Sequence, residues 1–271
     1  MPADIDAVTR ILEEAAVEEV LPRFQALQSH EVSEKESGEL VTVADVQAEA
    51  HISRRLRELR PDAYLVGEEA VAADPAILEK IAAEPLVWVV DPIDGTANFA
   101  RGNPVFAIMV GLVEHGRTVA AWIHDPVAGT TATAASGAGA WLGCRRMTAA
   151  TAAPLKEMRG TLHASTYATP EMARQIQARR SRVNAVKSLR CAGHEYLRLS
   201  TGQLHFSLFT RLMPWDHVPG TLIYREAGGL ARTLDGSEYG ARSYRAGGLL
   251  LAPDAAAWQD LHDVLLHPEN D

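Results

Sequence analysis

The sequence predicts a mixed fold of the α+β or α/β class, which combines helices with antiparallel strands and with alternating strand–helix segments. Apolar residues recur at helical spacing over residues 4–27. From residue 105 to 143, short apolar strands are separated by turn residues, which is typical of an antiparallel meander. After Pro154, strand and helix patterns alternate. We therefore expect a globular protein with a sizeable core.

The N-terminal part is expected to contain two helices. Residues 4–27 form the first, and Pro22 kinks or ends it. Residues 30–39 (HEVSEKESGE) are polar and without a pattern, which predicts a loop. The second helix lies within residues 40–61, where Thr42 caps the start and a proline stops the end. Acidic residues in its early turns and basic residues in its last turns suit the helix dipole.

Two short strands are expected next, each followed directly by acidic residues. Residues 63–67 (AYLVG) predict the first strand, and Glu68 and Glu69 follow it at once. Residues 74–85 predict a short helix. Residues 86–90 (LVWVV) are apolar at every position, which is typical of a strand buried on both faces.

The rest of the chain divides into the meander and an alternating section. The expected strands are residues 105–113, 118–124, 131–135 and 141–143, then 161–166, 184–190, 204–210 and 246–253. The expected helices are residues 170–181, 194–202 and 219–229, and one that starts at Ala255. The best boundary lies at residues 145–155, so we expect an N-terminal subdomain of residues 1–150 and a C-terminal subdomain of residues 151–271.

The composition excludes several classes of protein. The formal net charge of −9 argues against a nucleic-acid coat and against a polybasic membrane anchor. It still allows an anionic substrate, because bound divalent cations can invert the local field. No apolar run approaches the roughly 20 residues that span a bilayer, and the N-terminus lacks the pattern of a signal peptide. Cys144 and Cys191 are not at metal-binding spacing. We therefore expect a cytoplasmic protein with no nucleic-acid or membrane partner.

Carboxylates stand at the starts or ends of several predicted elements. They are Asp45 in the second helix, Glu68 and Glu69 after the first strand, Asp91 and Asp94 after the LVWVV strand, and Asp216 in PWDHVPG. A single surface carboxylate is usually a solvated charge or a helix cap. Asp91 differs because it directly follows a buried strand, with Asp94 on the adjoining turn. Two carboxylates this close repel each other unless a cation lies between them.

Oxygen ligands without nearby histidine or cysteine favour Mg²⁺ or Mn²⁺ over zinc. Gly95 and Thr96 follow the aspartates and offer backbone N–H groups and a hydroxyl, so the segment predicts half of a metal-assisted phosphate site. Phosphatases of the haloacid dehalogenase type use DxD, whereas Asp91 and Asp94 are spaced DxxD with Pro92 between them. The spacing fits a metal clamp better than a phospho-aspartate nucleophile.

Several segments in the same order resemble those of one known family. They are LVTVADVQAE (40–49), GEE (67–69), DPIDGTANF (91–99), GAGAWLG (137–143), PWDHVPG (214–220) and REAGG (225–229). Together they resemble the inositol monophosphatase family of metal-dependent sugar phosphatases. The resemblance implies a layered αβαβα sandwich, usually homodimeric, that hydrolyses phosphomonoesters with Mg²⁺.

The resemblance also implies a set of site residues. The metal ligands would be oxygens in two overlapping sets: Glu68, Asp91 and the carbonyl of Ile93 for the first ion, and Asp91, Asp94 and Asp216 for the second. Thr96, supported by Asp45, would orient the attacking water, and Glu68 would take part in catalysis through its metal. The N–H groups of Gly95 and Thr96 would receive the phosphate, and Asp94 would also touch the substrate. A third Mg²⁺ near Glu68, replacement by Mn²⁺ and inhibition by Li⁺ are further implications.

The sequence departs from the family pattern around the substrate pocket. Residues 190–196 (RCAGHEY) stand where the family carries small residues that line the pocket. His194 and Glu195 would then lie at or near that wall, unless they are helix-surface residues. The glutamate that inositol-specific members carry near Phe209 or Thr210 is absent. We therefore predict that myo-inositol 1-phosphate is not the preferred substrate, that His194 meets a second anionic group, and that Glu195 meets an amine or a hydroxyl.

Two further residues have open interpretations. Lys35, in the loop before the second helix, is expected to be solvated, with approach to a phosphate as the alternative. His217, beside Asp216, is expected to support the ligand or to be structural. Val218 and Pro219 stand where the family more often has small residues, and this change affects local packing without removing a ligand.

These observations predict a Mg²⁺-dependent phosphomonoesterase that acts on a small phosphorylated metabolite through a metal-activated water. Within the same fold, a bisphosphate nucleotidase, a fructose-1,6-bisphosphatase and a histidinol-phosphate phosphatase are the alternatives. An alternative of another class is a regulatory binding protein with residual activity.

Overall fold

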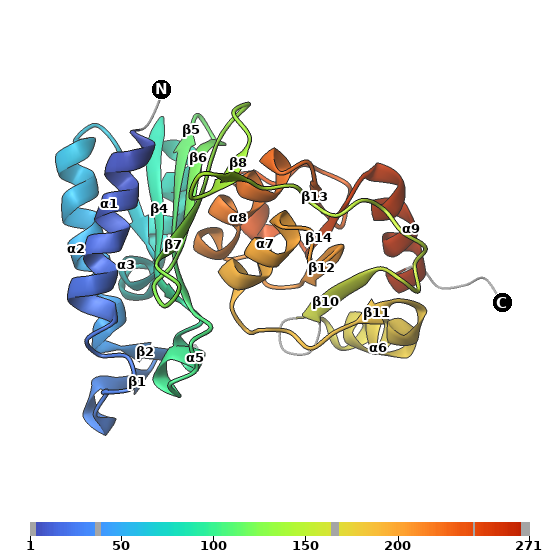
Figure 1. The fold of residues 1–271 in the computed structure, drawn as a ribbon, viewed down its shortest axis with the longest axis horizontal. Helices are drawn as coiled ribbons and strands as arrows, with labels where there is room; N and C mark the ends of the chain where they lie inside the picture. The colour runs from blue at the N-terminus through green and yellow to red at the C-terminus, as the bar shows by residue number, and fades with distance from the viewer. Residues whose placement is uncertain (1–3, 36–38, 164–167, 241, 267–271) are drawn as a thin grey trace.

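The computed structural model describes residues 4–35, 39–163, 168–240 and 242–266. Helices and sheets alternate in five layers, from the α1 and α2 pair at one end to α6 and α9 at the other (Figure 1). The prediction of a mixed, layered αβαβα fold is confirmed. The division into residues 1–150 and 151–271 stays a prediction.

The first layer is formed by two N-terminal helices. α1 (Ile5–Ala15) continues as a π-helix (Ala16–Val20), and α2 covers Val43–Leu59. Apolar residues on their facing sides pack against the large sheet. The expected loop at residues 30–39 instead contains β1 (Val32–Glu34), which pairs antiparallel with β2 (Leu40–Thr42), at the start of the range predicted for the second helix. Three-residue strands are too short to show the apolar alternation that would have revealed them.

The second layer is a seven-stranded sheet in the order β3-β4-β5-β6-β7-β8-β9. Its strands are β3 (Tyr64–Gly67), β4 (Leu86–Asp94), β5 (Ala107–Glu114), β6 (Arg117–Asp125), β7 (Thr130–Ala135), β8 (Ala140–Leu142) and β9 (Arg145–Arg146). Along β4, Trp88 and Val90 pack toward α1 and α2, whereas Val87 and Val89 pack into the opposite core. Both faces are buried, as the LVWVV pattern predicts, because successive side chains of a strand point to opposite faces.

Short helices connect these strands. α3 (Glu68–Ala73) follows β3, a 3₁₀ turn (Pro75–Glu79) and α4 (Lys80–Ala83) precede β4, and α5 (Thr96–Ala100) follows it. Further 3₁₀ turns cover Ser29–Glu31, Arg180–Arg182 and Ser243–Arg245.

The middle layer consists of α7 (Ala192–Ser200) and α8 (Pro214–Glu226), which pack between the two sheets. The prediction that this last helix starts at Pro219 is wrong, because α8 begins at Pro214. A proline is favourable at the first helical position, where its missing N–H group is not needed. The early start places Asp216 in the first turn, where the helix dipole favours a carboxylate.

The fourth layer is a five-stranded sheet in the order β11-β10-β12-β14-β13. Its strands are β10 (Arg159–His163), β11 (Asn184–Ala185), β12 (Phe206–Phe209), β13 (Leu230–Thr233) and β14 (Leu249–Ala252). α6 (Pro170–Arg179) and α9 (Ala255–Leu266) cover its outer face as the fifth layer. β13 is an addition to the predicted elements, and β11 is much shorter than predicted. Part of the expected strand 161–166 lies outside the described residues.

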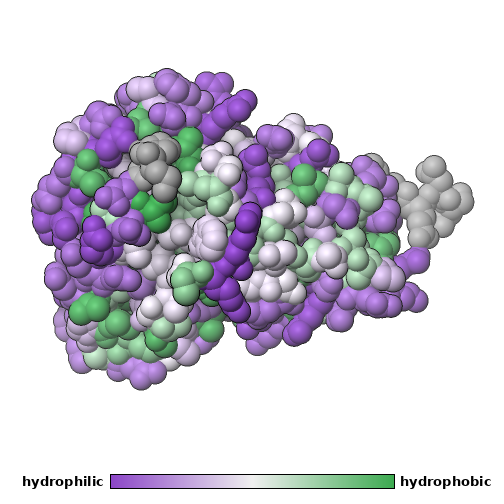
Figure 2. Space-filling model, turned by 45° about the horizontal axis from the view of Figure 1, so that its top comes forward, coloured by the Kyte–Doolittle hydropathy of each residue, from purple (hydrophilic) through white to green (hydrophobic). Residues whose placement is uncertain are grey.

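Figure 2 shows hydrophilic side chains over most of one face, with small hydrophobic areas between them. Among the described residues, no helix is both long and apolar enough to cross a bilayer.

Candidate active site

The end of β4 brings the two aspartates of DPIDGT into the interior. The pairing of β4 with β5 changes register between Asp91 and Asp94, and this irregularity bends the strand end. Gly95 follows with φ of 89°, a conformation that side chains disfavour. A Cβ atom there would also lie 3.0 Å from the carbonyl oxygen of Val105. The glycine is therefore required for the turn that ends the strand.

Three carboxylates converge at this point. Asp91 and Asp94 come from β4 and Asp216 from the first turn of α8, and one oxygen of each lies within 4.8 Å of the others. Asp91 is 1% exposed, and its buried Oδ1 has no hydrogen-bond partner among the described residues. A buried carboxylate oxygen without a donor is costly unless it binds a cation. The donor set consists of oxygens alone, which fits Mg²⁺ or Mn²⁺.

The raised pKa values of Asp91 and Asp216 also favour a bound cation at this point. Burial, followed by the negative charges of Glu68, Asp94 and Asp216, raises the pKa of Asp91 well above its usual range. Burial and the charge of Asp94 raise the pKa of Asp216 to about 7. A divalent cation would reverse both effects, because it favours the ionised form of each group.

Glu68 belongs to the same cluster and is held by a lysine. Burial is the main cause that raises the pKa of Glu68 to about 8, although the charge of Lys35 opposes it. Nζ of Lys35 lies 2.7 Å from an oxygen of Glu68 and 2.7 Å from an oxygen of Glu69. The expectation that Lys35 is solvated is wrong, because two carboxylates at the start of α3 compensate its charge.

A second group of residues supports Thr96, the residue after the glycine turn. Oγ1 of Thr96 lies 3.0 Å from Oδ1 of Asp45 and 2.9 Å from the carbonyl oxygen of Ile93. The other oxygen of Asp45 accepts hydrogen bonds from the N–H and hydroxyl groups of Thr42, at 2.7 and 2.6 Å. Burial raises the pKa of Asp45 to about 6, and the Thr42 hydrogen bonds oppose the rise. The start of α2 therefore fixes an acceptor beside Thr96.

Asp94 is oriented by α7. Its Oδ1 accepts a hydrogen bond from the N–H group of Ala192 at 3.1 Å, and its Oδ2 accepts from Gly193 at 2.6 Å. The thiol of Cys191 donates to the same oxygen at 2.9 Å. These residues of the RCAGHEY segment thus hold a predicted metal ligand through two backbone N–H groups and one thiol, a role that the sequence pattern does not reveal.

These residues border one cavity of about 520 Å³. Its lining includes Glu68, Asp91, Ile93, Asp94, Gly95, Thr96 and Asp216, so seven predicted site residues meet in one place. Asp45 lies behind Thr96 and outside the lining. Arg190 and Trp215, from the RCAGHEY and PWDHVPG segments, also line the cavity. Other lining residues are absent from the predicted site, among them Arg101, His163, Ser188 and Arg211. They carry no local motif.

The structure places His194 and Glu195 outside the lining of this cavity. Nε2 of His194 lies 3.1 Å from the carbonyl oxygen of Phe106, and Asp125 is its nearest carboxylate, at 3.6 Å. Glu195 is fully buried, so it is not a helix-surface residue either. The expectation that both residues lie at the pocket wall is therefore wrong. Glu195 lies on the inner face of α7 and contacts β10 and β12 of the five-stranded sheet.

His217 lies in the lining and is neutral. Its Nδ1 lies 2.9 Å from the hydroxyl oxygen of Tyr196, and its Nε2 lies 2.9 Å from the carbonyl oxygen of Arg211. Burial lowers its pKa to about 4. Its contacts support the first turn of α8 beside Asp216.

Comparison with known proteins agrees with this geometry. The sequence model of the inositol monophosphatase family matches residues 2–268. The fructose-1,6-bisphosphatase/inositol-1-monophosphatase of Thermotoga maritima is 31% identical over 212 residues, which cover 78% of each chain. Inositol monophosphatase 2 of Solanum lycopersicum is 32% identical over 78% of this chain and 81% of its own. The Nus factor SuhB of Vibrio cholerae is 29% identical over 76% of each chain.

Solved structures share the fold. The suhB protein of Bartonella henselae superposes with a TM-score of 0.81 at 24% identity, over 97% of this chain and 100% of that one. SaIMPase-II with bound 2′AMP has a TM-score of 0.80 at 24% identity, over 97% and 93% of the two chains. The relatives named as phosphatases confirm the prediction of a phosphomonoesterase. The chain belongs to the inositol monophosphatase family.

Proposed function

We propose that this chain is a Mg²⁺-dependent phosphomonoester hydrolase that acts on a small soluble phosphate. The proposal rests on the convergence of Asp91, Asp94 and Asp216 around a buried oxygen without a hydrogen-bond partner among the described residues. Glu68 and the backbone of Ile93 border the same cavity and would complete the ligand set. When bound, Mg²⁺ supplies positive charge to the phosphate and makes a water acidic enough to attack near neutral pH.

Thr96 and Asp45 would orient that water. The Thr96 hydroxyl has one proton and two acceptors, Oδ1 of Asp45 and the carbonyl oxygen of Ile93. If the carbonyl is used as a ligand, the hydroxyl donates to Asp45, and its oxygen lone pairs face the water. The water would then donate a hydrogen bond to Oγ1 of Thr96 and keep a lone pair for the phosphorus atom. As the water loses its proton to Thr96, the Thr96 proton would pass to Asp45.

The phosphate itself would be received by backbone groups. Gly95 and Thr96 both line the cavity, and the turn at Gly95 brings main chain rather than a side chain toward the ligand. N–H groups that are fixed in this way stabilise negative charge without reorganising during the reaction.

We propose that inositol 1-phosphate is not the preferred substrate. Phe209 and Thr210 stand where a sugar-binding glutamate is expected. Phe209 lines the cavity and offers no acceptor to a hydroxyl group, and the hydroxyl of Thr210 donates to the carbonyl oxygen of His163. A site selects a hydroxyl-rich ring through buried polar groups that pair with it. Relatives are named for fructose-1,6-bisphosphatase and inositol-1-monophosphatase activity, and 2′AMP is bound in SaIMPase-II, so sugar bisphosphates and nucleotides are candidates.

The test is phosphate release from an aryl phosphate with Mg²⁺, with Mn²⁺, with EDTA and with added Li⁺. We expect turnover that requires a divalent cation and is inhibited by Li⁺. Turnover that is unaffected by EDTA would contradict the proposal. A panel of inositol 1-phosphate, nucleotide bisphosphates, fructose 1,6-bisphosphate and histidinol phosphate would then rank the substrates by kcat/KM.

A regulatory binding role is a second candidate, favoured by relatives named Nus factor SuhB. The complete carboxylate set favours catalysis, and an absence of turnover on the whole panel would favour the regulatory role. A homodimer in the cytoplasm is proposed from the family resemblance. Sedimentation at several protein concentrations would test the dimer.

A further inference from the structure

The strongest unexplained feature is Glu195, a buried carboxylate that the metal site does not use. It is 0% exposed and lies on the inner side of α7. Its Oε2 accepts hydrogen bonds from the hydroxyl groups of Thr161 at 2.6 Å and Ser207 at 3.2 Å. Its Oε1 accepts from the hydroxyl of Ser188 at 2.9 Å and from the N–H group of Leu189 at 3.0 Å. One side chain thus ties β10, β12 and the loop before α7 together.

The charge partner of Glu195 borders the cavity. Nε2 of His163 lies 2.6 Å from Oε2 of Glu195, and the imidazole ring stacks on Phe209 with 4.5 Å between ring centroids. Burial raises the pKa of Glu195, but the contact with His163 and the hydrogen bonds from Thr161 and Ser188 together outweigh burial, and the pKa lies below its usual value. His163 lines the cavity, and its side chain is 24% exposed. Glu195 at Nε2 and the hydroxyl of Ser188, 3.5 Å from Nδ1, therefore fix the ring, which keeps part of its surface exposed at the cavity.

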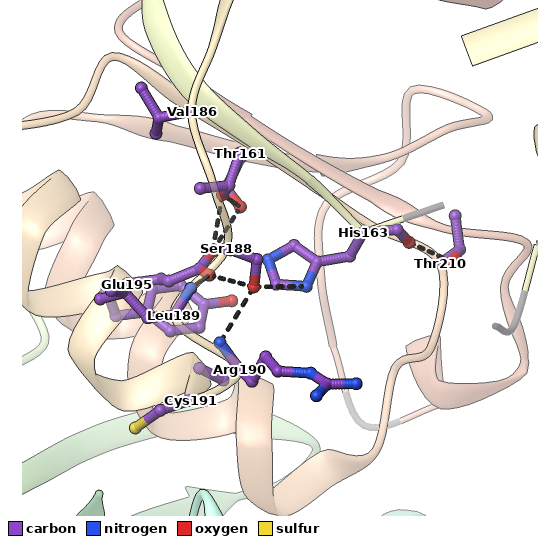
Figure 3. Close-up of polar contacts among 12 residues, drawn as sticks. Thr161, His163, Val186, Ser188, Leu189, Arg190, Cys191, Glu195 and Thr210 are labelled. Carbon is purple, nitrogen blue, oxygen red and sulfur yellow. Dashed lines mark hydrogen bonds and ion pairs between the residues drawn. The ribbon is translucent and has the colours of Figure 1, made fainter. Parts of the chain in front are cut away.

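The same network fixes an arginine in an unfavourable conformation. Arg190 has φ of 56°, in the left-handed region that favours glycine. Its N–H group donates to Oγ of Ser188 at 3.0 Å, and Ser188 in turn donates to Glu195 (Figure 3). Its carbonyl oxygen accepts from the side-chain amide of Asn98. Arg190 lines the cavity, and its surroundings hold its backbone in this strained conformation. Strain of this kind at a cavity points to a functional role.

A second arginine borders the cavity from the neighbouring segment. Arg101 directly follows α5, and Asn98 of α5 donates to the carbonyl oxygens of Leu189 at 2.9 Å and Arg190 at 3.4 Å. The end of α5 and the Arg190 loop are therefore hydrogen-bonded to each other. Both arginines are exposed lining residues. Guanidinium groups bind phosphate and carboxylate groups through two parallel hydrogen bonds.

The cavity thus has two kinds of lining. Carboxylates gather where the metals and the reacting phosphate are proposed to lie, and Arg101 and Arg190 add positive groups elsewhere in the lining, beside the imidazole of His163. We propose that Glu195 is a positioning residue that holds His163 and Arg190 as a recognition site for a second anionic group, a phosphate or a carboxylate, on the substrate. The inference rests on the proposed phosphatase function and names its substrate class.

Matched substrates test the proposal directly. Fructose 1,6-bisphosphate and fructose 1-phosphate differ only in a second phosphate, and 3-phosphoglycerate and glycerol 3-phosphate differ in a carboxylate. We expect the wild type to prefer the member with the second anion in at least one pair, by about tenfold or more in kcat/KM, as for one charged hydrogen bond. The pair that shows the preference tells a phosphate site from a carboxylate site.

Variants connect the preference to the named residues. Arg190→Gln is expected to reduce the preference about tenfold, mainly through KM for the doubly anionic substrate. Arg174→Gln on α6 removes the same charge from an exposed residue outside the cavity lining and should leave the preference unchanged. Glu195→Gln keeps the shape of the side chain and should also reduce the preference through KM. If Glu195→Gln fails to fold, His163→Gln tests whether the pair formed by these two residues contributes to the preference.

The outcomes separate the two levels of the argument. If the wild type hydrolyses no phosphomonoester with Mg²⁺, the proposed function fails. If it hydrolyses an aryl phosphate but gains nothing from a second anion in either pair, only this inference is overturned. A preference that survives Arg190→Gln and His163→Gln would also overturn it, whereas a preference lost in both supports it.

Discussion

The hydroxyl of Thr96 lies 3.0 Å from Oδ1 of Asp45, although the two residues belong to different elements, α5 and α2. Asp45 is itself held on its other oxygen by Thr42. If a ligand occupies the carbonyl oxygen of Ile93, Asp45 is the acceptor that remains for the Thr96 proton, and the first turn of α2 then sets the direction of the hydroxyl. Removing either member should disturb the direction of the hydroxyl more than the shape of the cavity.

Thr96→Ala is expected to lower kcat by about 10²-fold or more, the usual range for a positioned proton-transfer group, with little change in KM. The alanine keeps the backbone N–H group for the phosphate and removes only the hydroxyl. Thr96→Ser retains the hydroxyl and should recover most of the rate. Steady-state kinetics on an aryl phosphate would measure both parameters. A variant with raised KM and unchanged kcat would show that Thr96 binds the substrate and does not orient the water.

Asp91→Asn is expected to abolish turnover and to leave the fold intact. An amide weakens both proposed metal sites, because Asp91 is the ligand they share. Removal of one of several mutually repelling buried carboxylates should also raise the melting temperature of the metal-free protein. Activity within about tenfold of the wild type at saturating Mg²⁺ would be too high for a shared ligand. Circular dichroism provides the control for folding.

Added Mg²⁺ should stabilise the wild type. A ligand that binds only the folded state contributes about 2.7 kcal/mol when its concentration is one hundred times its Kd. The melting temperature should therefore rise with Mg²⁺ concentration, and Asp91→Asn should lose most of this rise. An equal rise in both proteins would place the bound cation elsewhere.

The stability of the protein should fall in mild acid because of His124. This residue on β6 is buried, its Nδ1 lies 2.9 Å from Oγ1 of Thr131, and burial lowers its pKa to about 4. Between pH 6.5 and 4 the unfolded chain binds a proton at His124 that the folded protein excludes, so stability is lost as the pH falls through this window. The stability advantage of wild type over His124→Gln should shrink by about 2 kcal/mol between pH 6.5 and 5.

Urea denaturation at both pH values would measure this difference. His30→Gln, at an exposed residue, serves as the control and should follow the wild type. Parallel pH dependence in wild type and His124→Gln would assign the acid sensitivity to other groups.

Gly220→Ala should loosen the contact between α7 and α8. A Cβ atom at Gly220 would lie 2.1 Å from Cδ2 of Tyr196, whose ring is fully buried. Overpacking of this kind costs about 1–3 kcal/mol, so the midpoint of urea unfolding should drop. Gly247→Ala is the matched control, because no atom lies within 4 Å of a Cβ atom there and the residue is exposed. Equal midpoints in the two variants would mean that Tyr196 moves at no cost.

The sequence predicts the clustering of acidic residues at the end of β4 well because its signals are local. A buried apolar strand that runs into Asp91 and Asp94, followed by a glycine turn, forms a contiguous segment, and the structure shows the strand, the turn and the clustering. Thr42 as the cap of α2 is a local signal of the same kind, and Thr42 and Asp45 exchange the hydrogen bonds of a capping box. Their roles in catalysis stay predictions.

The rest could not be predicted because it depends on partners that are distant in the chain. Glu195 resembles any charged residue on a helix until β10 brings His163 beside it. Lys35 resembles a loop lysine until α3 places Glu68 and Glu69 next to it. The start of α8 differs from the predicted start at Pro219, because Pro214 takes the favourable first helical position and Pro219 lies inside the helix. The apolar periodicity of a helix or strand does not show whether one of its polar side chains is buried.

The packing of α8 between the two sheets has a consequence for protein engineering. Asp216 reaches Asp91 and Asp94 only because α8 lies against the large sheet on one side and the smaller sheet on the other. The DPIDGT segment is therefore not a portable module. Grafted into another scaffold it would bring two repelling aspartates without the third that completes the site. Redesign of this catalyst has to begin from the whole sandwich, with α8 as the part that must not be shifted.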